Sequence, residues 1–143
     1  MVGEGEERPR LAALAARLGV AERVRLLGAR PQADLPALYS AADVLVLASS
    51  REGWANVLLE AMACGTPVVA SDIWGNPEVV RAPEAGVIVP RTAAGIAAGV
   101  ACLAEAPPDR AATRAYAEGF GWEETTAGQM ALFRRVVAER GAG

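Results

Sequence analysis

Two glutamates, Glu52 and Glu60, stand out because of where they lie along the chain. Glu52 lies in a short loop that follows an apolar run, and Glu60 lies in a stretch that is otherwise Val, Leu, Leu, Ala, Met, Ala and Cys. A carboxylate on an apolar element needs a partner or a ligand. The pair therefore indicates either a ligand site or, as the plainer alternative, a solvated loop glutamate and a helix glutamate favoured by the helix dipole.

The residues between the two glutamates predict a helix start that attracts phosphate. Gly53 lets the backbone turn tightly and approach a ligand closely. Asn56 is a good N-cap, which leaves the amides of the first helical turn directed outward. Free N–H groups and the helix dipole together favour a bound anion. We therefore expect a phosphate-bearing ligand beside this helix start.

The elements around this segment predict an α/β fold with a doubly wound, Rossmann-like parallel sheet. Four apolar runs are continuous rather than alternating, as expected for parallel strands covered on both faces; they are residues 24–27, 44–47, 68–70 and 87–89. Helical patterns lie beside or between them, at residues 8–18, 34–41, 56–64 and 77–81. The order β-α-β-α-β implies right-handed crossovers. In such folds ligands bind at the carboxyl ends of the strands, which is where Glu52 falls.

The two ends of the chain differ from its middle. Residues 1–5 look like the last residues of a strand that enters a glycine-containing turn, so we expect a first strand to be missing. After Pro90 only helices are predicted, at residues 93–105, 109–118 and 123–140. We interpret residues 1–143 as one domain, with residues 108–140 as its helical end. In the loop before residues 77–81, Asn76 is expected to cap a helix that has Pro77 at its first position.

Composition excludes several classes of function. The 143 residues carry a net charge of −3, whereas proteins that bind nucleic acid usually carry an excess of positive charge. There is no His, so a zinc site, a Ser-His-Asp triad or a Cys-His dyad cannot be built from this chain alone. Its two cysteines are far apart, which favours reduced thiols and a cytoplasmic location. The first residues do not resemble a signal peptide, and no apolar run is long enough to span a bilayer.

Glu52 and Glu60, embedded in REGWANVLLEAMACGTPVVASD, resemble the double-glutamate signature of retaining glycosyltransferases of family 4. These enzymes have two Rossmann-like domains, the GT-B architecture. The context agrees along nearly the whole chain, in the segments VGEGEERPRL, VRLLGARPQADLPALYSAADVLVLASS, GNPEVV, GVIVP and FGWEE. The resemblance implies the C-terminal, nucleotide-sugar-binding half of such an enzyme, which transfers a sugar from a nucleotide-diphosphate donor with retention of configuration.

The resemblance also implies roles for individual residues. Glu52 would be the catalytic residue that contacts hydroxyls of the transferred sugar, and Glu60 would accept hydrogen bonds from the ribose hydroxyls, a role that suits a carboxylate. The donor sugar and pyrophosphate would face the backbone amides of Gly53, Trp54, Ala55 and Asn56. The nucleotide base would lie along Gly28, Ala29 and Arg30. No metal and no cofactor is expected, because the nucleotide sugar is a substrate.

The basic residues that neutralise the donor diphosphate in this family, and its N-terminal acceptor-binding domain, would lie upstream of Met1. The chain contains no Lys to replace them, so we expect it to be inactive alone. The face exposed towards that domain, and the last helix with Met130, Phe133 and Val137, predict self-association. One alternative is a nucleotide-binding or interaction module that pairs with a separate chain. Another is a GT-B relative such as a nucleotide-sugar epimerase, against which the glutamate pair argues.

Overall fold

The computed structural model describes residues 1–141, except for the side chains of Trp122, Glu124 and Thr125. Its centre is a parallel sheet of three strands in the order β1-β2-β3. The strands are β1 (Leu45–Leu47), β2 (Val68–Ser71) and β3 (Gly86–Val89). Leu45 lies opposite Val68, and Val69 lies opposite Val87. The predicted parallel α/β architecture is confirmed, although residues 142–143 of the predicted domain lie outside the described part.

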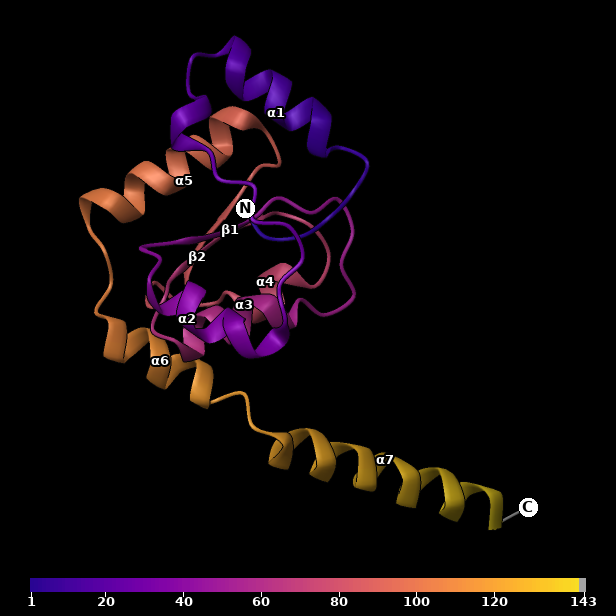
Figure 1. The fold of residues 1–143 in the computed structure, drawn as a ribbon. Coiled ribbons are helices and arrows are strands. Elements are labelled where there is room, and N and C mark those ends of the chain that lie inside the picture. The colour runs from indigo at the N-terminus through magenta and orange to yellow at the C-terminus, as the bar shows by residue number, and fades with distance from the viewer. Residues whose placement is uncertain (142–143) are drawn as a thin grey trace.

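Helices cover both faces of this sheet. They are α1 (Arg8–Arg17), α2 (Leu35–Ser40), α3 (Asn56–Ala63), α4 (Asn76–Val79), α5 (Ala93–Glu105), α6 (Arg110–Glu118) and α7 (Trp122–Gly141), with 3-10 turns at Ala21–Arg23 and Gln32–Asp34. Figure 1 shows α1 and α5 on one side of the sheet and α2, α3 and α4 on the other. The predicted helices are confirmed to within two residues at each end.

The core lies on the two faces of β2, whose residues are all buried. Val68 and Ala70 pack with residues of α3 and α4, and Val69 packs on the opposite face with Leu103 of α5. This alternation follows from the two-residue period of a strand. Gly99 brings α5 close to the sheet, since a Cβ there would lie only 2.9 Å from the Val69 Cγ1 atom.

The strand predicted at residues 24–27 is not part of the sheet. Its backbone bonds to the first residues of the chain, where Met1 N donates to Arg25 O (2.6 Å), Leu27 N to Met1 O (2.9 Å) and Gly3 N to Gly28 O (2.9 Å). Neither residues 1–3 nor residues 24–27 form a regular strand. Two such short segments without further partners do not make a regular ladder, which is why the prediction of a sheet strand was wrong.

Two predicted helix caps are displaced by one residue. Ala55 is the N-cap of α3, and Gly75 is the N-cap of α4, so both asparagines are the first residues of their helices. Neither helix has a side-chain cap. Asn76 is fully buried, and its side-chain amide donates to Ser71 O at 2.9 Å instead of capping, whereas Asn56 is exposed and lies one position inside α3.

Helix α6 is fastened to the layer of α2 and α3 by Arg110. Its guanidinium donates to Ala42 O (2.9 Å), Ser40 O (2.8 Å) and Thr66 Oγ1 (3.0 Å). These acceptors belong to the segments at the ends of α2 and α3, where carbonyl groups lack helical partners. One side chain thus joins three segments of the chain.

Helix α7 projects away from the body of the molecule (Figure 1). Its large apolar residues are exposed, at 46% for Met130, 59% for Phe133 and 70% for Val137. Within residues 1–141, no helix is long and apolar enough to cross a membrane. The predicted helical segment 108–140 therefore has two parts, because α6 packs on α3 and α7 does not pack on the sheet layers.

Candidate functional site

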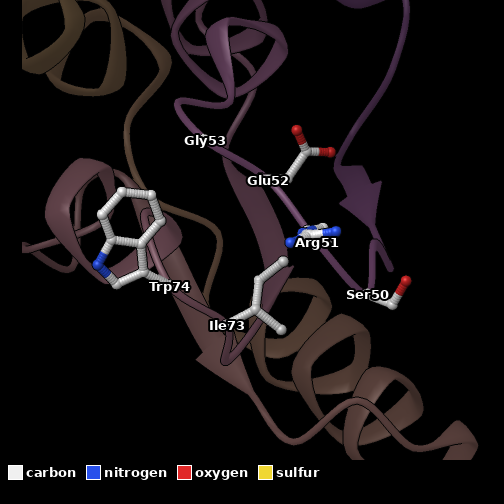
Figure 2. Close-up of a pocket in the computed structure, with 6 residues that line it drawn as sticks. All are labelled: Ser50, Arg51, Glu52, Gly53, Ile73 and Trp74. Carbon is white, nitrogen blue, oxygen red and sulfur yellow. The ribbon is translucent and has the colours of Figure 1, made fainter.

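An open pocket of about 490 Å³ lies where the loops after β1 and β2 meet. Its lining residues are Ser50, Arg51, Glu52, Gly53, Ile73 and Trp74. Figure 2 shows Arg51 and Glu52 on the loop after β1, beside Ile73 and Trp74 on the loop after β2. The pocket thus occupies the carboxyl ends of two neighbouring parallel strands, the edge at which doubly wound folds bind ligands.

Contacts between the two loops fix the shape of the pocket. The Ser71 hydroxyl donates to Ser49 O at 2.7 Å, so the exits of β2 and β1 are joined. Gly75 has φ of +93°, and a Cβ on it would lie 2.6 Å from Gly53 O. Only glycine allows both this conformation and this approach. The loop that carries Trp74 therefore rests on the backbone of the loop that carries Glu52.

Of Glu52 and the four residues that follow it, Glu52 and Gly53 line the pocket. Glu52 is half-buried in the pocket wall, directly before Gly53. Among the described residues, the amides of Gly53, Trp54 and Ala55 make no hydrogen bond. The amide of Asn56 instead donates to Trp54 O at 3.0 Å. The exposed residues Gly53 and Trp54 thus have amides without a partner among the described residues, whereas Ala55 is buried and the amide of Asn56 is already engaged.

Glu60 lies on α3 outside the lining of the pocket. It is half-buried, and its Oε2 atom accepts a hydrogen bond of 3.0 Å from the Tyr39 hydroxyl on α2. Burial, the hydrogen bond to Glu60 and the negative charge of that side chain raise the pKa of Tyr39 to about 12. The sequence analysis did not identify this partner.

The predicted base-binding turn lies elsewhere. Gly28 is buried beside the N-terminal segment, where a Cβ would lie 2.6 Å from the Glu4 Oε1 atom, whereas Ala29 and Arg30 are exposed. None of these three residues lines the described pocket. The structure therefore brings together Glu52 and Gly53, but it does not bring Gly28, Ala29 and Arg30 into the same cavity.

Sequence reasoning missed two of the six residues that line the pocket, Ile73 and Trp74. Ile73 and Trp74 follow β2 just as Glu52 follows β1, so the rule about strand ends could have found them. Trp74 is 77% exposed, although it lines the pocket. Trp54 instead packs towards Phe120, with ring centroids 6.4 Å apart. Of these two tryptophans, Trp74 is thus the one that lines the described pocket.

The described residues contain no group of three His, Cys, Asp or Glu side chains that could hold a metal ion. The pocket contributes one carboxylate, from Glu52, and one guanidinium, from Arg51. That set can accept hydrogen bonds from hydroxyl groups and attract one anionic group. The expectation that the reaction needs no metal stays a prediction.

Comparisons with known proteins bear on this site. The profile of a family described as "Glycosyl transferases group 1" matches residues 1–120. The chain is 38% identical, over an alignment 147 positions long, to a D-inositol 3-phosphate glycosyltransferase of Salinispora arenicola, and this alignment covers 97% of the chain. A D-inositol 3-phosphate glycosyltransferase of Mycobacterium tuberculosis is 37% identical over 139 residues.

Two solved structures are also similar. Sucrose-phosphate synthase of Thermosynechococcus elongatus matches with a TM-score of 0.78 and 32% identity, over 94% of this chain and 35% of that one. HepE of Anabaena in complex with UDP matches with a TM-score of 0.72 and 27% identity, over 94% of this chain and 40% of that one. The chain spans about a third of the length of its curated relatives, with 32% for the Salinispora arenicola protein.

Proposed function

This chain belongs to the group 1 family of glycosyl transferases, and we propose that it forms the nucleotide-sugar-binding half of a retaining, family 4-like GT-B enzyme. The observation that carries the proposal is the pocket at the carboxyl ends of β1 and β2, because Glu52 and Gly53 of the double-glutamate segment line it. Its ligand would be a nucleotide-diphosphate sugar. The matching N-terminal half, which would bind the acceptor, would be its partner.

The donor would lie along the start of α3. Glu52 would accept hydrogen bonds from hydroxyls of the sugar, and the amides of Gly53, Trp54 and Ala55 would face the sugar and the pyrophosphate. Glu60, one turn further along α3, would accept hydrogen bonds from the ribose hydroxyls. Gly28, Ala29 and Arg30 would lie along the base. The engaged amide of Asn56 makes it the weakest member of the proposed set.

In the proposed reaction, the bond between the anomeric carbon and the diphosphate oxygen breaks, with its electron pair staying on that oxygen. A bond from the anomeric carbon to an acceptor hydroxyl oxygen forms, and the hydroxyl proton passes to the departing diphosphate. The diphosphate leaves as an anion, which preorganised amides and basic side chains stabilise. Arg51 is the one basic side chain among the lining residues of the described pocket. We therefore expect this chain alone to bind the donor without transferring the sugar at a useful rate.

The acceptor, the donor nucleotide and the cellular location are proposed as follows. The names of the curated relatives make a phosphorylated polyol the first acceptor to test. The UDP in the HepE structure makes a uridine nucleotide the first donor to test. Cys64 and Cys102 are both free thiols, which is consistent with a cytoplasmic setting.

Calorimetry on the chain with UDP, GDP and ADP, each with and without an attached hexose, tests the donor site. We expect one nucleotide to bind, and Glu60→Ala to weaken binding of both of its forms about 10-fold to 100-fold, because a hydrogen bond to a charged group is lost. Glu52→Gln should weaken only the form that carries the sugar. Glu22→Gln, on a remote exposed turn, is the matched control and should change neither. No binding at millimolar nucleotide would refute the proposal.

A chimera distinguishes a catalytic half from a binding module that pairs with a separate chain. This chain would replace the C-terminal half of the Salinispora arenicola relative, and release of nucleoside diphosphate would be measured with D-inositol 3-phosphate as acceptor. We expect turnover that Glu52→Gln lowers by at least about 100-fold. A chimera that binds the donor as tightly as the isolated chain and shows no turnover would favour the binding module.

A further inference from the structure

The side chain of Glu60 is held by a neighbour that the proposed function does not include. The Tyr39 hydroxyl donates to Glu60 Oε2 at 3.0 Å, from α2 to α3. No hydrogen bond to the other carboxylate oxygen, Oε1, occurs within the described part of the chain. A carboxylate has about four lone-pair positions, so this contact uses one and leaves Oε1 open.

Tyr39 is itself held in place by a backbone hydrogen bond and by packing of its ring. Its carbonyl accepts a hydrogen bond of 2.7 Å from the hydroxyl of Thr66, which is fully buried. That hydroxyl in turn accepts a hydrogen bond of 3.0 Å from Arg110 of α6. The ring of Tyr39 also packs against the larger core cluster. A chain of contacts therefore runs from α6 through Thr66 and Tyr39 to the carboxylate of Glu60.

The phenol keeps its proton throughout the neutral range, as an ordinary tyrosine does, and burial, with a further contribution from Glu60, raises the pKa of Tyr39 to about 12. The hydroxyl can then act only as a donor towards this carboxylate. A fixed donor on one oxygen restricts rotation of the carboxylate about its last torsion, which is otherwise broad. The direction of the other oxygen is thereby restricted as well.

We propose that Tyr39 is a positioning residue for donor binding, which orients the Glu60 carboxylate so that Oε1 is presented to a ribose hydroxyl. This inference rests on the proposed function, since it needs Glu60 to contact the ribose. It deepens that function by adding a residue of α2, 21 positions before Glu60 in the chain, to the determinants of ribose recognition. The competing explanation is that the pair only fastens α2 to α3.

The test compares ribose with deoxyribose on the intact chain. Calorimetry would use whichever of UDP, GDP and ADP binds, together with its 2′-deoxy and 3′-deoxy analogues. We expect Tyr39→Phe to weaken binding of the ribonucleotide about 5-fold to 10-fold, as for one lost hydrogen bond. The loss should fall below about 2-fold for the analogue that lacks the hydroxyl bound by Glu60, because removing either partner ends the same interaction.

Tyr116→Phe is the matched control, since it removes the other tyrosine hydroxyl, which donates to Val79 O at 2.8 Å. It should leave all affinities unchanged. If Tyr39→Phe weakened the ribonucleotide and both deoxy analogues equally, or weakened none of them, the positioning role would be refuted. If Glu60→Ala also left binding unchanged, the proposed function would fail as well, so the two failures can be told apart.

Glu60→Gln tests the same idea with Tyr39 intact. A positioned glutamine would give its carbonyl oxygen to the Tyr39 hydroxyl and present its NH₂ group to the ribose. Because a ribose hydroxyl can also accept a hydrogen bond from that NH₂ group, the affinity of Glu60→Gln for the ribonucleotide should fall between those of the unaltered chain and Glu60→Ala. Unchanged affinity would mean that no charged acceptor faces the ribose, and it would overturn the inference even if Tyr39→Phe did not fold.

Discussion

At the scale of single residues, the contact between Gly75 and Gly53 decides how the pocket is shaped. The two residues lie in loops after different strands, and each loop carries part of the pocket wall. Gly75 combines a positive φ with a backbone oxygen in the place where its Cβ would be. A side chain there would have to push the Trp74 loop away from the Glu52 loop.

Substitution of Gly75 by alanine tests this contact. We expect Gly75→Ala to lower the free energy of unfolding by about 2–4 kcal/mol, because it adds backbone strain to a clash with Gly53 O. Urea denaturation would measure the change. Gly53→Ala is the matched control for stability, since its Cβ would meet no atom within 4 Å, and it should cost less than about 1 kcal/mol. Equal losses would show that the close approach does not matter.

The sequence could predict some site residues and not others, for a physical reason. Glu52 follows an apolar run, and the ends of parallel strands form the ligand edge, so its place in the pocket was predictable. The hydrogen bond between Tyr39 and Glu60 joins two helices, and it depends on how α2 docks on α3. No local pattern encodes that docking, so the partner of Glu60 could not be predicted.

At the scale of elements, Arg110 links α6 to the ends of α2 and α3, while Thr113 and Tyr116 of the same helix bond to other segments of the fold. Its guanidinium satisfies carbonyls at the end of α2 and also donates to Thr66, whose hydroxyl binds the Tyr39 carbonyl. Guanidinium presents several donors in a rigid plane, whereas an ammonium group offers a single charged point. A lysine at this position could not reach all of these acceptors at once.

We expect Arg110→Ala to lower the free energy of unfolding by about 1–3 kcal/mol, since several charge-assisted hydrogen bonds are lost at a partly exposed site. Arg110→Lys should recover less than half of this loss. Arg114→Ala, on the same helix, removes an exposed ion pair with Glu118 and should cost no more than about 0.5 kcal/mol. Guanidinium chloride denaturation of the three variants would decide, and similar losses for Arg110→Ala and Arg114→Ala would contradict the linking role of Arg110.

Elements that depend on residues close in the sequence could be predicted, whereas elements that depend on distant segments could not. Helices α5 and α6 begin where Thr92 and Asp109 accept hydrogen bonds from amides three residues ahead, a signal that the sequence carries. The strand predicted at residues 24–27 failed because a strand needs neighbours, and its apolar pattern does not show which neighbours are present.

At the scale of the whole molecule, helix α7 exposes a row of large apolar side chains, which includes Met130, Phe133 and Val137. Phe133 and Val137 lie four positions apart on the same side of the helix, and both are well exposed. Exposed apolar side chains in such a row mark a contact surface. We propose that α7 contributes to self-association of this chain, as expected from the sequence.

Light scattering across the micromolar range would test this proposal. We expect the mean mass of the chain to rise with concentration and Phe133→Glu to suppress the rise, because a charge cannot be buried in an apolar contact without a partner. Ala131→Glu adds the same charge on the opposite side of α7 and is the matched control, which should leave the rise intact. A constant monomer mass for the unaltered chain would contradict the proposal.

The outer edge of β1 has one more consequence. The Leu45 amide donates towards β2, to Pro67 O at 3.0 Å, and successive amides of a strand alternate in direction, so the Val46 amide points away from the sheet. Val46 is also 41% exposed, whereas β2 is buried throughout. In deuterated water, the Val46 amide should therefore be labelled first and those of β2 last. The order of labelling would show that the sheet opens most easily at the outer edge of β1, the strand that leads to Glu52.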